Sequence, residues 1–194
     1  MGLKNMMQNY PKQQNMWRAV WGTWETHSWD DWEKLVGRAF CLTTGKHLHW
    51  VVPMFFMQDK DKLGVWKHHF GTHSAILSAF AHDKFKEWRW QQYKEFLELL
   101  TVKDDDDSVQ CNIATACSAG RHRSQAWAWV LWILGKYLEV VVEDVDHLSW
   151  WEQFVGKCAR RGKKCDECAE HSSDNGKGEL AKFFISEFKA VAST

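Results

Sequence analysis

The sequence lacks the features of secreted and membrane-spanning chains. Residues 1–14 are polar and hold no apolar run of the kind found in a secretory signal. No stretch reaches eighteen uncharged apolar residues, so no membrane partner is expected. Proline is scarce, with two residues in 194, and 45% of the residues are apolar, which excludes a disordered chain. A folded domain with a sizeable core is therefore predicted.

A net charge is also missing, because 25 acidic side chains balance 25 basic ones. Any affinity for phosphate or nucleic acid must then come from a local cluster rather than from the field of the whole molecule.

Six cysteines are present, and three of them fall within eleven residues near the C-terminal end. That crowding favours metal or thiol chemistry over a disulfide framework. It predicts a reducing, intracellular location, which we take to be cytoplasmic.

Hydrophobic periodicity predicts a mixed α/β fold. The expected order is a Trp-rich helix up to about residue 26, strands 40–43 and 47–52, helices 75–81 and 83–100, strand 109–116, helix 124–136, strand 138–142, and helices 149–155 and 178–192. Strand 109–116, helix 124–136 and strand 138–142 form a βαβ unit, whose strands run parallel and whose crossover is right-handed. We therefore expect a single α/β domain with a mainly parallel central sheet flanked by helices.

The chain divides by composition into an extension and a domain. Residues 1–35 are interpreted as an N-terminal, Trp-rich helical extension, since Trp17, Trp21 and Trp24 follow helical spacing. Residues 36–194 are interpreted as the α/β domain.

The segment between strand 109–116 and helix 124–136 carries the strongest functional signal. A strand that enters a helix through a short Gly-containing turn leaves the first N–H groups of the helix unpaired and directed at one spot, where the helix dipole adds positive charge. Arg123 can add a bidentate fork to a phosphate, and Ser124 falls where the helix begins. A phosphate-binding loop is therefore predicted, formed by Cys117, Ser118, Ala119, Gly120, Arg121, His122, Arg123 and Ser124.

This loop resembles the signature of the cysteine-dependent protein tyrosine phosphatases, Cys-x-x-Gly-x-x-Arg-Ser/Thr, at Cys117, Gly120, Arg123 and Ser124. The resemblance implies that Cys117 is a nucleophile, that Arg123 holds the phosphoryl group and that Ser124 assists the departing thiolate. Two features depart from that family. Ala116 stands where the phosphatases usually have histidine, and no carboxylate lies in a recognisable acid-loop motif.

The loop also resembles that of the RapZ family C-terminal domain, Cys-x-Gly-Gly-x-His-Arg-Ser, at Cys117, Gly120, His122, Arg123 and Ser124. This resemblance extends to the aromatic-rich helix before the strand, to the strand and His-containing segment after the helix, and to the His69-x-Gly71-Thr72-His73 motif, over roughly residues 40–155. It implies a domain that binds a phosphosugar and RNA and is not itself a catalyst.

Two further histidines are candidate ligand contacts. His73 belongs to a polar, His-containing loop at residues 59–73, and His147 lies where it can face the loop from the end of the following strand. For each of them, a purely structural polar role is the competing interpretation.

A basic, Cys-rich loop is expected at residues 157–175. Its five basic side chains between Lys157 and Lys164 form either a solvated surface or a track for RNA phosphates. Four side chains there have ligand types that suit tetrahedral zinc, although a loop of thiols without metal is the favoured interpretation. These are Cys158, Cys165, Cys168 and His171. No cofactor is required, and a structural zinc ion is the alternative.

The His122-Arg123-Ser124 triplet favours recognition over catalysis, because a phosphatase tolerates many residues before its arginine. We therefore predict a non-catalytic domain that binds a phosphorylated small molecule or RNA. One alternative is a phosphomonoesterase that forms a phosphocysteine at Cys117. A structural or protein-interaction domain is the other.

Overall fold

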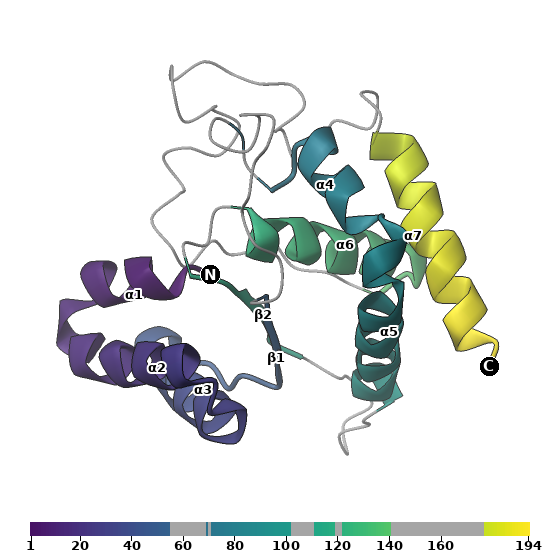
Figure 1. Cartoon of the computed structure of the whole chain (residues 1–194). Coiled ribbons are helices and arrows are strands. Elements are labelled where there is room, and N and C mark those ends of the chain that lie inside the picture. The colour runs from purple at the N-terminus through teal and green to yellow at the C-terminus, as the bar shows by residue number, and fades with distance from the viewer. Residues whose placement is uncertain (55–68, 70, 102–110, 119–121, 141–176) are drawn as a thin grey trace.

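The computed structural model describes residues 1–54, 69, 71–101, 111–118, 122–140 and 177–194, and the structural statements below concern these residues (Figure 1). They form seven α-helices, two short strands and two 3-10 turns. In chain order these are α1 (Leu3–Asn9), η1 (Pro11–Gln13), α2 (Gln14–Thr26), α3 (Trp29–Thr44), β1 (Trp50–Pro53), α4 (Ser74–Phe80), η2 (Asp83–Phe85), α5 (Lys86–Thr101), β2 (Ile113–Ala116), α6 (Arg123–Tyr137) and α7 (Lys177–Ala192). No helix in this part of the chain is long and apolar enough to cross a bilayer.

The two strands pair in parallel, with Trp50 opposite Ile113 and Pro53 opposite Ala116. A single further bridge joins Gly2 to Cys117, also in parallel. The mixed α/β class and the parallel pairing agree with the sequence-based expectation. The described residues are mostly helical, however, and a larger central sheet is not confirmed.

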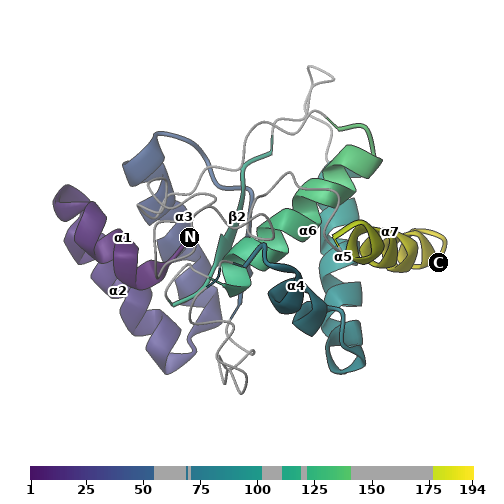
Figure 2. The same cartoon turned by 90° about the horizontal axis from the view of Figure 1, so that it is seen from above.

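Helices cover both faces of this strand pair. Figure 2 shows α1, α2 and α3 on one side of the strands and α4, α5, α6 and α7 on the other. Side chains along a strand alternate between its two faces. Val51 accordingly packs among the first set of helices in what we term the N-terminal core, whereas Val52 packs in the C-terminal core with the second set. The strands therefore lie between two apolar clusters.

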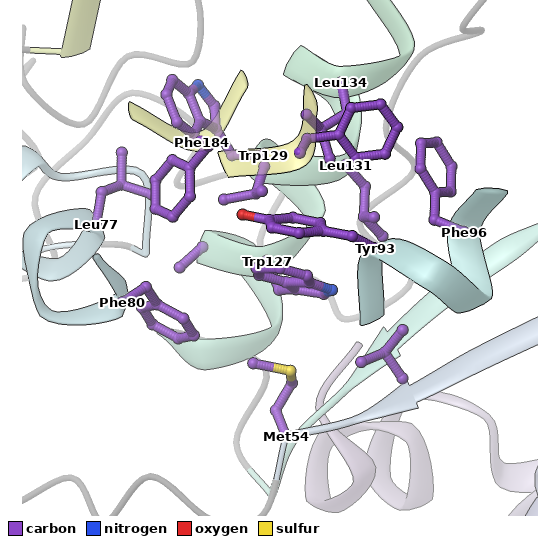
Figure 3. Close-up of a cluster of buried hydrophobic side chains, with 14 of the residues drawn as sticks. Met54, Leu77, Phe80, Tyr93, Phe96, Trp127, Trp129, Leu131, Leu134 and Phe184 are labelled. Carbon is purple, nitrogen blue, oxygen red and sulfur yellow. The ribbon is translucent and has the colours of Figure 1, made fainter. Parts of the chain in front are cut away.

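Aromatic rings fill much of the C-terminal core. Tyr93 of α5 stacks on Trp127 of α6, with ring centroids 5.9 Å apart (Figure 3). Tyr93 also contacts Phe188 of α7 edge to face. Trp127 also contacts Trp88, with centroids 4.6 Å apart. This core holds α6 in place, and α6 carries the last two residues of the predicted loop, Arg123 and Ser124.

Several predicted elements are confirmed. Helix 124–136 corresponds to α6 and helix 178–192 to α7. The predicted strand 109–116 is confirmed as β2 at residues 113–116 only, because residues 111–112 are not strand and residues 109–110 lie outside the described part of the chain. The expected helix 75–81 is α4, and 83–100 is η2 followed by α5.

Other predicted elements are wrong. Residues 40–43 are not a strand, because Ala39 and Phe40 continue the buried stripe of Trp32 and Val36, and α3 therefore runs on to Thr44. The expected single N-terminal helix is interrupted by η1, which contains Pro11.

The predicted strand 138–142 does not begin at residue 138. Leu138 forms the C-cap of α6, and Glu139 has a left-handed φ of 57°. Among the described residues, β2 pairs in parallel with β1, which precedes it in the chain. Residues 141–142, helix 149–155 and the basic loop 157–175 lie outside the described residues. The division at residues 35 and 36 stays a prediction, although α3 runs across it.

Candidate functional site

The predicted phosphate-binding loop, which we call the anion loop (residues 117–124), joins β2 to α6 (Figure 1). Cys117 follows β2 directly, and α6 begins at Arg123 with His122 as its N-cap. Three loop residues lie outside the described part of the chain, namely Ala119, Gly120 and Arg121. The expected order of strand, loop and helix is thus confirmed.

Side chains on the two sides of the anion loop contact each other. The Cys117 thiol donates to the Ser124 hydroxyl, with Sγ 3.3 Å from Oγ. The Thr115 hydroxyl donates to the Ser124 carbonyl oxygen at 2.6 Å. Ser124 is completely buried, and Cys117 is 2% exposed. These two contacts connect the end of β2 to the first turn of α6.

The Arg123 side chain reaches from the start of α6 to Ser118, at the other end of the anion loop. Its guanidinium donates from Nη2 to the Ser118 hydroxyl oxygen at 3.3 Å, and the residue is only 8% exposed. A guanidinium is charged at every physiological pH, so this contact places a fixed positive charge beside the loop. The first turn of α6 contains no acidic side chain that would offset this charge and the helix dipole.

Residues 69 and 71–73 lie against the start of α6 and form what we call the flanking segment. A Cβ atom added to Gly71 would overlap the carbonyl oxygen of His122 and would lie 2.6 Å from the amide nitrogen of Ala126. The backbone of the flanking segment therefore approaches the backbone of α6 at a distance that only glycine allows. His122 also contacts this segment, with Nε2 3.1 Å from the carbonyl oxygen of His69.

Histidines of the flanking segment gather beside this contact. The rings of His69 and His73 lie 4.0 Å apart between centroids, tilted by 48°. His73 Nδ1 accepts from the Ala75 N–H at 3.2 Å and so caps α4. His73 was predicted to contact a ligand. Its segment lies beside the first turn of α6, and its ring caps α4. Whether it also touches a ligand stays a prediction.

Gly71 and His69 were not among the predicted site residues. The signal that could have identified them was the His69-x-Gly71-Thr72-His73 motif, in which a glycine between polar residues marks a close backbone approach. Periodicity alone could not show which element the glycine approaches.

The remaining candidates lie outside the described residues. These are His147 and the four suggested zinc ligands, Cys158, Cys165, Cys168 and His171. Within the described ranges, no three His, Cys, Asp or Glu side chains are grouped closely enough to hold a metal ion. The structural zinc ion therefore stays a prediction.

Comparison with family models, with curated proteins and with solved structures found no match for this chain. The resemblances to the RapZ C-terminal domain and to the tyrosine phosphatases thus rest on the sequence motifs described above. What the described site offers chemically is an arginine, two hydroxyls, a buried thiol and a helix N-terminus at the end of a strand.

Proposed function

We propose that this protein binds a phosphorylated ligand, either a phosphosugar or an RNA phosphate, at the anion loop and does not transform it. The observation that carries the proposal is the position of Arg123, whose guanidinium contacts Ser118 at the start of the loop and is largely buried. A positive charge that is largely shielded from water attracts an anion more strongly than an exposed charge does.

Three features of the loop suit a phosphate. Arginine offers a planar fork that matches two phosphate oxygens. The α6 N-terminus directs backbone N–H groups and partial positive charge to the same side. The Ser118 hydroxyl contacts the guanidinium and can exchange that contact for one to a phosphate oxygen.

Isothermal titration calorimetry with inorganic phosphate, a hexose 6-phosphate and a short single-stranded RNA tests the proposal. A hydrogen bond to a charged group contributes about 1.5–3 kcal/mol, so Arg123→Ala is expected to weaken binding by roughly ten-fold to a hundred-fold. Arg123→Lys keeps the charge but loses the fork, and an intermediate affinity is expected.

Arg18→Ala is the matched control, because Arg18 is an exposed arginine on α2. This variant should bind like the unmodified chain. Undiminished affinity of Arg123→Ala would contradict the proposal. If the unmodified chain binds none of the three probes, a structural or protein-interaction domain becomes the better interpretation.

One observation favours a second candidate, a cysteine-dependent phosphomonoesterase. The Cys117 sulfur lies 3.3 Å from the Ser124 hydroxyl, the group that the phosphatase resemblance assigns to the departing thiolate. In that reaction the thiolate sulfur bonds to phosphorus, the ester oxygen leaves with a proton from an acid, and water then releases phosphate from the cysteine.

Turnover of an aryl phosphate separates the two candidates. The binding domain should show no hydrolysis, and Cys117→Ser should leave its phosphate affinity largely unchanged. Rapid, vanadate-sensitive hydrolysis that Cys117→Ser abolishes would replace the binding proposal with the enzymatic one.

A further inference from the structure

Residues 1–4 lie alongside the end of β2 and the first two residues of the anion loop. Gly2 bridges to Cys117 in parallel. The Cys117 N–H donates to the Met1 carbonyl oxygen at 3.1 Å, and the Leu3 N–H donates to the Cys117 carbonyl oxygen at 3.0 Å. The Lys4 N–H donates to the Ser118 carbonyl oxygen, also at 3.0 Å. Three backbone hydrogen bonds thus link two segments that are far apart in the chain.

These bonds restrict the orientation of the loop backbone. The N–H and the carbonyl oxygen of Cys117 are both hydrogen-bonded to residues 1–4. Rotation of the peptide group on either side of Cys117 would therefore break one of these bonds. The same two loop residues carry the thiol that contacts Ser124 and the hydroxyl that contacts Arg123. The positions of these side chains therefore depend on the pairing with residues 1–4.

The N-terminal core in turn anchors residues 1–4. Leu3 and Met6 of α1 are fully buried in that core together with Trp17 of α2. Ala114 and Ala116 of β2 belong to the same cluster. Packing of α1 against the other N-terminal helices and the strand thus holds Gly2 beside Cys117.

We propose that residues 1–4 are a positioning segment for the anion loop, so that anion affinity depends on their pairing with Cys117 and Ser118. The proposal rests on the proposed anion-binding function. Loss of the pairing allows Cys117 and Ser118 to adopt other backbone orientations, and the ligand must then supply the free energy that orders them.

Leu3→Pro isolates the pairing. Leu3 is the first residue of α1, a position that suits proline. Gly2 before it is extended, with φ −109° and ψ 114°, the conformation that a residue before proline prefers. Proline removes the N–H that donates to Cys117. Leu3→Ala is the matched control, because it removes most of the buried side chain but keeps this N–H.

The variants are compared by titration with inorganic phosphate at a temperature where both are folded. Leu3→Pro is expected to bind at least about ten-fold more weakly than Leu3→Ala. Peptide-resolved alkylation with iodoacetamide provides a readout without ligand, and Cys117 should react faster in Leu3→Pro than in Leu3→Ala. Equal phosphate affinity of the two variants would overturn the proposal.

Hydrogen exchange in the unmodified chain tests whether bound phosphate in turn stabilises the pairing of residues 1–4. Because coupling between two equilibria is reciprocal, saturating phosphate must slow exchange of the Leu3 and Lys4 amides, measured by NMR. Unchanged exchange in the presence of bound phosphate would overturn the proposal, and this measurement decides the matter if Leu3→Pro does not fold. If the unmodified chain does not bind phosphate, the proposed function fails. The alkylation comparison still tests the positioning role in that case, because it needs no ligand. Equal reactivity of Cys117 in Leu3→Pro and Leu3→Ala would then overturn the role of residues 1–4.

Discussion

At the scale of single residues, Gly71 shows how closely the flanking segment approaches α6. A Cβ atom at this position would overlap the His122 carbonyl oxygen and lie 2.8 Å from the Gln125 Cβ atom. Gly71→Ala is therefore expected to destabilise the fold by about 1–3 kcal/mol, as overpacking of a close contact does. It should also weaken phosphate binding, because the displaced backbone belongs to the N-terminus of α6. Thermal unfolding and phosphate titration measure the two effects.

The matched controls are Gly22→Ala and Gly37→Ala. These glycines lie inside α2 and α3, and a Cβ atom on either meets nothing within 4 Å. Alanine favours a helix over glycine by about 0.5–1 kcal/mol, so both controls should raise the melting temperature. A Gly71→Ala variant as stable as these controls would show that the close approach is not a structural requirement.

At the scale of elements, a buried ion pair joins α5 to α7. Arg89 donates from Nε and Nη2 to the two carboxylate oxygens of Glu187, each at 2.6 Å, and from Nη1 to the Phe80 carbonyl oxygen of α4. The Tyr93 hydroxyl donates to Glu187 at 3.1 Å. Burial, followed by the nearby Glu187 charge, raises the pKa of Tyr93 well above its usual range, which keeps the hydroxyl protonated as a donor.

Glu187→Gln should therefore leave a buried guanidinium without its counter-charge, at a cost of about 3 kcal/mol or more. Chemical denaturation measures this as a lower midpoint. Glu179→Gln is the control on the same helix, since Glu179 pairs with Lys182 and both side chains are largely exposed. No measurable change is expected from the control. Similar midpoints for the two variants would contradict the structural importance of the buried pair.

At the scale of the whole molecule, the two cores share one pair of strands. Trp17 is fully buried in the N-terminal core and Trp127 in the C-terminal core. Neighbouring residues of β1, Val51 and Val52, contribute one to each. Because a strand cannot keep one face packed while the other unfolds, we expect the two cores to unfold together.

Trp17→Ala and Trp127→Ala should each lower the stability of the whole chain by about 3–5 kcal/mol. Unfolding followed by far-ultraviolet circular dichroism and by tryptophan fluorescence should show one transition, at the same midpoint for both probes. A Trp17→Ala variant that loses only part of its helical signal would instead support residues 1–35 as an independent extension.

Local features were the part of this protein that could be predicted from its sequence. The apolar stripes of α5, α6 and α7 and the apolar end of β2 depend on neighbours within a few residues. The order of Cys117, Ser118 and Arg123 between a strand and a helix is likewise local. The prediction failed at residues 40–43, where the β-prone Phe40 and Thr43 were outweighed by the buried stripe of α3.

Long-range pairings could not be predicted from local pattern and became visible in the folded chain. Periodicity shows that a face is buried, but it does not identify the element that covers it. β2 therefore pairs with β1 in the described residues, Gly71 lies against α6, and residues 1–4 lie beside Cys117, without any local signal for these choices. Local pattern was enough to predict an arginine and a thiol at a strand–helix turn. The tertiary structure decided what surrounds them, because burial of apolar area is non-directional and only the packing of the complete chain selects among the surfaces that fit.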